Sequence, residues 1–369
     1  MYKILIGLFL SVLCLQAKCQ MQFDEGSFSE VLAKAKQEKR MVFMDCYTSW
    51  CGPCKMMVQD VFSREDVGQF MNTRFVNVKL DMEKGEGREL AKKYQVKVYP
   101  TFLILNEDGE VIHKMVGGMK AEEFLQNVQN GIGEHSLYSY EKRYANGERD
   151  PQFVYSYIET LARAFMKERM EEVLHEYWGT LTDQEKSGKE NWMLVKRFVK
   201  NPSLPEYKYL LEYKKDFDAA VSKDSVDRKI YDDLFPLIVN DCNEIIFHDK
   251  VNAAELLDTY KTCVTQSGIA GQDYLLDIVE FTKVFLSGDL KKALKMYDKK
   301  FSRLDSDARF DVTLQLNGML IRKGDAKMCK RGLELIEKTM KDCGWSVDDP
   351  LFAAVVSGLK DKFKDDKDE

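Results

Sequence analysis

The sequence lacks a basic cluster on any predicted face, and its formal net charge is −6 over 369 residues. Proteins that bind nucleic acid or anionic lipid usually present such a cluster, so neither is an expected partner. It also lacks a second Cys/His pair spaced like Cys51 and Cys54, and it has only 4 histidines, which argues against a zinc site. With 44% hydrophobic and 31% charged residues it is neither disordered nor a polytopic membrane protein. A folded chain of two or three domains is the expectation.

The N-terminal segment has the pattern of a secretory signal. Lys3 precedes an apolar run over residues 4–15, and Ala17 lies in the small-residue region after it. This run is too short to span a bilayer, which takes roughly 20 residues. We therefore expect a signal peptide at residues 1–19 and an exported, periplasmic or otherwise extracytoplasmic protein with no span in the mature chain. Lipoprotein anchoring through Cys19 stays open, although Lys18 stands where a small residue is usual.

Residues 23–133 alternate between strand and helix patterns. Ser27 and Glu30 form a capping box that predicts a helix to residue 39, and Ser63 with Asp66 predicts another helix start. Strands are predicted at residues 41–44, 75–80, 101–105 and 111–116, with the last two joined by a hairpin turn at residues 106–109. Helices are predicted at residues 86–94 and 120–132. The pattern indicates an α/β domain with a central mixed sheet flanked by helices on both faces.

The pattern changes after Gly133, because strand-like runs almost vanish and apolar residues recur at helical spacing. Residues 136–360 are predicted to form an all-α domain, and residues 361–369 a charged tail. Two Gly-Asp turns occur at residues 288–289 and 324–325, and the spacing between them is close to the 34-residue period of tetratricopeptide helix pairs. A tetratricopeptide-like array and a plain helical bundle both remain open.

The segment Trp50-Cys51-Gly52-Pro53-Cys54 follows an apolar strand and opens a helix. Two intervening residues at a helix start bring both sulfurs within disulfide range, and we expect the first sulfur to be exposed. The free N–H groups of the helix start stabilise a thiolate there. Cys51 would attack a substrate disulfide and Cys54 would resolve the mixed disulfide. An inert structural disulfide is the competing interpretation.

This pentad resembles the redox motif of the thioredoxin family, and the resemblance covers about 110 residues, or 30% of the chain. It implies a thioredoxin fold for the α/β domain. Asp45 matches the family's buried acid, which would relay a proton to or from Cys54; burial would raise its pKa toward neutrality. Lys79 matches the lysine beside that acid, where its influence would be electrostatic.

The same resemblance implies a substrate-binding surface around the two cysteines. Pro100 matches a cis-proline facing the disulfide, and the backbone of Tyr99 would pair with a substrate peptide as a short added strand. Gly117 matches the glycine of a third substrate-facing loop. The expected substrate-binding residues are Trp50, Gly52, Pro53, Tyr99, Pro100 and Gly117.

Two features depart from the family pattern. Cys46 replaces an aromatic residue after the buried acid, and we expect it to face away from Asp45 as a small buried residue. The loop around residues 83–87 is two residues longer than in the shortest members. Four further cysteines, Cys242, Cys263, Cys329 and Cys343, are expected to be buried free thiols, with a Cys242–Cys263 bridge left open.

The expected function is an extracytoplasmic thiol–disulfide oxidoreductase that reduces protein disulfides and needs no cofactor or metal. Its partners would be proteins with disulfides or thiols, together with a membrane-linked electron donor. Two alternatives stay open: a disulfide oxidase or isomerase, and a client-binding chaperone or adaptor in which the thioredoxin domain mainly docks partners.

Overall fold

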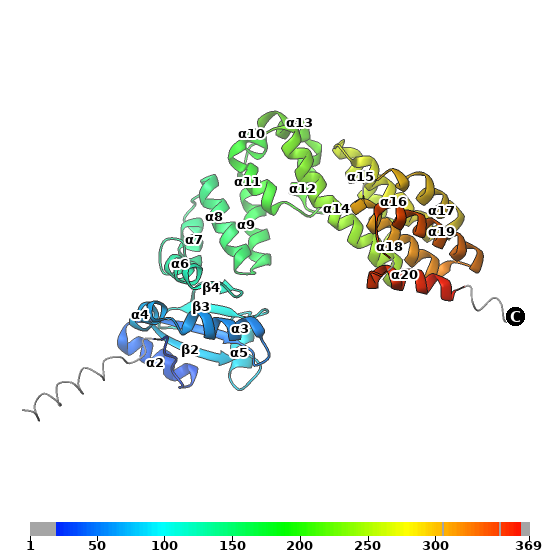
Figure 1. Cartoon of the computed structure of the whole chain (residues 1–369). Helices are drawn as coiled ribbons and strands as arrows, with labels where there is room; N and C mark the ends of the chain where they lie inside the picture. The colour runs from blue at the N-terminus through cyan, green and yellow to red at the C-terminus, as the bar shows by residue number, and fades with distance from the viewer. Residues whose placement is uncertain (1–19, 305, 347, 363–369) are drawn as a thin grey trace, which may run out of the picture. The chain divides into compact units, whose positions relative to one another are not determined.

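The computed structural model describes residues 20–304, 306–346 and 348–362 (Figure 1). The chain divides into two compact units, Met1–Leu181 and Thr182–Glu369. None of the described helices is both long enough and apolar enough to cross a membrane. The predicted signal peptide with Cys19, and residues 363–369 of the predicted tail, lie outside the described residues.

A four-stranded sheet with the order β2-β1-β3-β4 forms the centre of the first unit. Its strands are β1 (Met41–Tyr47), β2 (Phe75–Asp81), β3 (Thr101–Leu105) and β4 (Val111–Val116). β1 is parallel to β2 and antiparallel to β3, and β3 is antiparallel to β4. The predicted mixed sheet is therefore confirmed. β1 is longer than its apolar run because Asp45, Cys46 and Tyr47 continue the pairing with β2.

Helices cover both faces of this sheet. Those of the first unit are α2 (Phe28–Glu38), α3 (Gly52–Met56), the π-helical segment η1 (Met57–Phe62), α4 (Glu65–Arg74), α5 (Gly87–Lys93), α6 (Ala121–Gly131), α7 (Leu137–Ala145), α8 (Pro151–Arg163) and α9 (Lys167–Thr180). On one face Phe43 and Phe102 pack against Phe62 of η1 and Phe124 of α6. On the other, alternate residues of β1 pack with α2 and α5. The alternation follows from the two-residue period of a strand.

Two predicted helix starts had different outcomes. The capping box is present at α2, where the Ser27 side chain accepts from the Glu30 backbone N–H and the Glu30 carboxylate accepts from that of Ser27. The helix start predicted from Ser63 and Asp66 is present, since α4 begins at Glu65, but its N-cap is Arg64. Ser63 does not cap, because its backbone is still helical at the end of η1 and only Arg64 is extended. Its hydroxyl donates instead to the Gln59 carbonyl, 2.5 Å away.

The first compact unit includes three helices beyond the predicted boundary at residue 133. α7 packs beside β4, and the Leu137 backbone N–H donates to Nδ1 of His113 at 3.3 Å. Burial lowers the pKa of His113 to about 4, which keeps its ring neutral and able to accept. Gly131 fits closely here, since a Cβ on it would lie 2.6 Å from the imidazole. The domain boundary at residue 133 stays a prediction.

The second unit is helical throughout its described residues. Its helices are α10 (Asp183–Ser187), α11 (Lys189–Phe198), α12 (Pro205–Glu212), α13 (Lys214–Ala220), α14 (Lys223–His248), α15 (Ala253–Ser267), α16 (Gln272–Ser287), α17 (Leu290–Lys299), the 3-10 turn η2 (Phe301–Arg303), α18 (Ser306–Lys323), α19 (Ala326–Cys343) and α20 (Pro350–Asp361). Asp289 caps α17 and Asp325 caps α19, each accepting from a backbone N–H three residues on. Both predicted Gly-Asp turns thus separate consecutive helices.

The cysteines outside the pentad are free thiols wherever the structure describes them. Cys46 packs among the residues on the α2 and α5 face, as expected, and burial raises its pKa. Cys242, Cys263 and Cys329 are buried, and the bridge between the first two is not formed. Cys343 is only half-buried, which corrects the prediction, because it is the last residue of α19.

Candidate active site

Cys51 and Cys54 form a disulfide at the start of α3, with their Cα atoms 5.4 Å apart. Cys51 is the N-cap, and its sulfur accepts from the Cys54 backbone N–H at 3.1 Å. Pro53 lies within the first turn, where its missing N–H leaves no helix bond unmade. The sequence Trp-Cys-Gly-Pro-Cys thus builds a helix start that offers its N–H groups to a sulfur.

Cys51 is less accessible than the sequence suggested. Its exposed fraction is 2%, and that of Cys54 is 3%. In the disulfide form the Cys51 sulfur is bonded to Cys54 and covered by that residue's N–H, which accounts for the difference. Gly52 and Pro53, by contrast, are exposed beside it.

Asp45 lies on β1 and is 1% exposed. Burial raises the pKa of its carboxyl group to about 7, and the positive charge of Lys79 acts in the opposite direction. Its Oδ1 atom has no hydrogen-bond partner among the described residues. A carboxyl group in this state can take up and release a proton near neutral pH.

Lys79 lies directly opposite Asp45 in the β1–β2 register. Its ammonium group lies over the ring of Tyr47, 4.6 Å from the centroid. Lys79 and Cys54 also line the same cavity of about 190 Å³, together with Thr48. The strand pairing thus places the lysine opposite the expected acid, and the cavity is shared by the lysine and the second cysteine.

The Tyr99–Pro100 peptide bond is cis, as the family resemblance implied. The Pro100 carbonyl accepts from the Gly117 N–H at 2.9 Å, which ties the two loops together. Gly117 has a φ of 94°, a conformation that favours glycine over other residues. These two expected substrate-binding positions are adjacent in the structure.

Trp50 is 65% exposed and packs edge-to-face with Tyr99, with ring centroids 6.2 Å apart. Its indole N–H donates to the carboxylate of Glu83 at 3.0 Å. Sequence reasoning assigned no role to Glu83, although it noted that the loop at residues 83–87 is long. This loop supplies a hydrogen bond that orients the exposed tryptophan.

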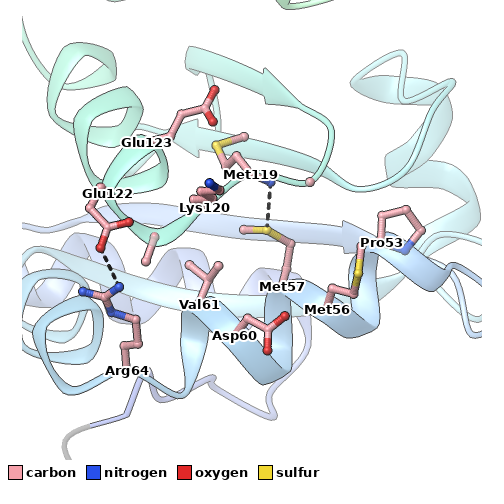
Figure 2. A pocket seen from close by; sticks show the side chains of 12 residues that line it. Pro53, Met56, Met57, Asp60, Val61, Arg64, Met119, Lys120, Glu122 and Glu123 are labelled. Carbon is pink, nitrogen blue, oxygen red and sulfur yellow. Dashed lines mark hydrogen bonds and ion pairs between the residues drawn. The ribbon is translucent and has the colours of Figure 1, made fainter.

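A groove of about 850 Å³ runs from Pro53 along α3 and η1 (Figure 2). Met56, Met57 and Val61 line one side, and residues 118–123 line the other. The Met119 backbone N–H donates to the Met57 sulfur at 3.3 Å. Sequence reasoning missed this groove, because its two sides are some 60 residues apart in the chain.

Comparison with known proteins matches residues 28–132 to the thioredoxin-like domain model. Thioredoxin from Bacillus subtilis strain 168 is 38% identical over 96 residues, which is 26% of this chain and 86% of that protein. Chloroplastic thioredoxin Y from Oryza sativa subsp. japonica is 31% identical over 107 residues, 29% of this chain. That match spans only 58% of the rice protein.

Among solved structures, a candidate disulphide-isomerase from Bacteroides thetaiotaomicron is 48% identical to this chain. The alignment covers 31% of this chain and 93% of that one, with a TM-score of 0.29. The family match ends at residue 132, so α7, α8 and α9 lie beyond it.

Proposed function

Because this chain belongs to the thioredoxin family through residues 28–132, we propose that it reduces disulfides in other proteins outside the cytoplasm. The N-terminal domain is a thiol–disulfide oxidoreductase domain with a Cys51–Cys54 disulfide. The observation that carries the proposal is the placement of that disulfide at a helix start with buried Asp45 on the strand before it.

Catalysis begins from the reduced pair. The Cys51 thiolate attacks one sulfur of the substrate disulfide, forms a mixed disulfide and expels the other substrate sulfur as a thiolate. Cys54 then loses its proton to the Asp45 carboxylate and attacks the Cys51 sulfur. This releases the second substrate thiolate and leaves the Cys51–Cys54 disulfide, so two electrons have passed to the substrate. Protons from solvent and from Asp45 balance the two product thiols.

An external dithiol must return two electrons to the Cys51–Cys54 disulfide after each turnover. We propose a membrane-linked donor, since export would separate the protein from cytoplasmic reductants. The reducing direction is supported by Gly52 and Pro53 between the cysteines, which resemble the dipeptide of reducing family members. A midpoint potential near that of thioredoxin is the expected result, and a potential near those of the strong oxidants would reverse the assignment.

Export is proposed from the N-terminal pattern of Lys3, the apolar run at residues 4–15 and the small residue that follows. The test is to recover the protein from its cells and determine its N-terminus and compartment. A mature N-terminus between residues 17 and 20 in an extracytoplasmic fraction is expected, and a cytoplasmic protein that retains Lys3 would refute export.

For the second unit we propose a tetratricopeptide-like arrangement. Its support is the recurrence of a Gly-Asp turn with an aspartate N-cap before α17 and before α19. Such arrays bind peptides along extended surfaces, which would suit a protein that acts on other proteins.

The chemical proposal is tested with insulin as the disulfide substrate and dithiothreitol as the donor. Cys51→Ser should lower turnover on the order of a thousandfold or more, because it removes the attacking sulfur. Cys343→Ser is the matched control, since that thiol is a half-buried residue of the second unit. Unchanged turnover in Cys51→Ser would refute the enzymatic function.

A further inference from the structure

The outer edge of β4 presents backbone groups that are not paired within the described chain. β4 is the last strand in the sheet order. The Gly117 N–H bonds to the Pro100 carbonyl, and the register places Thr101 opposite Val116 and Leu103 opposite Lys114. Bonded and non-bonded pairs alternate in antiparallel strands, so Lys114 and Val116 direct their N–H and C=O groups away from β3.

This edge does not face open solvent. Lys114 and Val116 line a cleft of about 610 Å³ whose other wall includes Ser156 and Thr160 of α8. Sheet edges are usually blunted or covered, because unpaired strands recruit other chains. Here α8, which follows the family-matched region, borders a cleft beside the edge.

The cleft continues into the groove beside the disulfide. Gly118 and Met119 line both of them. A Cβ on Gly118 would lie 3.5 Å from the Cβ of Pro53, next to the two cysteines. A polypeptide lying along β4 would therefore reach the redox centre without leaving the surface of the domain.

The lining of the cleft favours recognition of backbone over recognition of one side-chain type. It combines apolar Phe165 and Met119 with Glu123, Arg163 and the neutral amide of Asn127. No single charge dominates this set. The feature that recurs at a fixed spacing is the row of strand N–H and C=O groups, which an extended segment of almost any sequence can pair with.

We propose that an extended segment of the substrate protein, adjacent to its disulfide, adds to β4 as a strand within this cleft. α7 and α8 then limit which segments fit and so determine substrate choice. This inference rests on the proposed function, because the occupant is the disulfide substrate of Cys51. Pairing with Lys114–Val116 involves about three residues, or roughly 10 Å of extended chain.

The first test traps the substrate on the enzyme. Full-length Cys54→Ser protein is reacted with insulin to give the Cys51 mixed disulfide, and hydrogen–deuterium exchange is followed in residues 111–116 by mass spectrometry. Lys114 is only 7% exposed, but its amide and that of Val116 lack a strand partner. They should exchange faster in the free chain than the amides of His113 and Met115, which face β3, and should become protected in the mixed disulfide. Unchanged exchange after trapping would refute strand addition, whereas failure to form any mixed disulfide would refute the proposed function itself.

The same measurement on the free chain distinguishes another occupant. If residues 111–116 are already protected, and that protection increases with protein concentration, a second copy fills the edge and the proposal is wrong. Exchange at residues 114 and 116 that does not change with protein concentration is the supporting result.

The second test compares Lys114→Pro with Lys114→Ala. Both variants lose the lysine side chain. Only proline also removes the backbone N–H of residue 114, which points away from β3 and takes no part in the pairing of β3 with β4. Turnover of insulin should fall about fivefold to tenfold further in Lys114→Pro than in Lys114→Ala. Turnover of hydroxyethyl disulfide, which is too small to reach the cleft, should be the same in both. Equal insulin turnover in the two folded variants would overturn the proposal.

If Lys114→Pro does not fold, Ser156→Trp provides the same test from the opposite wall by filling the cleft. Lys142→Trp is its matched control, since Lys142 is exposed on α7 and does not line the cleft. Ser156→Trp should slow insulin reduction and leave hydroxyethyl disulfide reduction unchanged. Loss of both activities, or of neither, would refute the role of the cleft.

Discussion

Asp45 in the first unit and Lys229 in the second are both charged residues buried inside their units. Their surroundings differ. Lys229 forms an ion pair with Asp233 one turn along α14 and also donates to the Val199 carbonyl at 2.8 Å. Asp45 has an oxygen with no hydrogen-bond partner among the described residues, although Lys79 lies opposite it in the sheet.

This difference separates a buried charged residue that is paired within the fold from one that can transfer a proton. Burial lowers the pKa of Lys229 and raises that of Asp233, and the partner's charge and hydrogen bond reduce each shift without cancelling it. For Asp45 only the charge of Lys79 acts against burial, and its pKa reaches about 7. A group left in this state costs stability, and such groups concentrate where proton transfer is needed.

The cysteines of the two units also differ in their surroundings. The first unit places two of them at a helix start and joins them, whereas Cys242 and Cys263 in the second are separate buried thiols. Burial raises the pKa of both helical thiols, which keeps them protonated and unreactive. Local environment, and not the number of cysteines, thus separates the Cys51–Cys54 pair from these two thiols.

The largest expected effect on stability comes from breaking the buried pair in the second unit. Lys229→Met leaves the Asp233 carboxylate without its partner and should destabilise that unit by about 3–5 kcal/mol. The double variant Lys229→Met with Asp233→Leu should recover most of this loss, because it removes the unpaired charge. Urea unfolding measures both, and equal stability of the single and double variants would contradict the structural role. Insulin reduction should be unaffected in the folded double variant.

The next effect has the opposite sign, because replacing Asp45 should raise the stability of the folded chain. Its folded pKa of about 7 lies above the ordinary 3.8, so the folded chain holds this proton more tightly than the unfolded chain does. Stability is therefore lost as the pH rises from about 4 to about 7, and the loss is complete above that. Asp45→Asn should be more stable than wild type at pH 8, by up to about 4 kcal/mol, and similar to it at pH 4.

Calorimetry at both pH values checks this prediction. The same change in unfolding temperature at pH 4 and pH 8 would show that burial does not perturb the carboxyl group. Asp45→Asn should also slow insulin reduction by about tenfold to a hundredfold, since the proton acceptor for Cys54 is lost.

The smallest effects come from helix caps, and here the two units should behave alike. Ser27→Ala removes the cap of α2. Asp289→Ala removes the cap of α17, where the Asp289 side chain accepts from the Lys292 N–H at 3.0 Å. Each should cost about 1 kcal/mol, because one backbone donor loses its partner. Thermal unfolding of the two variants measures the change. A loss several times larger at either cap would mean that its side chain has a role beyond capping.

Much of the first unit could be predicted because its signals are local. The hairpin turn at residues 106–109, the capping box at Ser27 and the pentad around Cys51 each lie within a few residues of sequence. The cis bond at Pro100 was expected only through the family resemblance. At Ser63 local reasoning found the helix start but not its cap, because the preceding π-helical segment keeps the Ser63 backbone helical and the extended N-cap is Arg64.

By itself the sequence determined the redox motif, the strand and helix periods and the two Gly-Asp turns, since these depend on neighbours along the chain. Only the tertiary structure decided which groups were buried, and with what partners. It removed Asp45 from water, set Glu83 against Trp50 and placed α8 across a cleft from the edge of β4. Burial and long-range pairing depend on residues far apart in the chain, and no local pattern records which of them will meet.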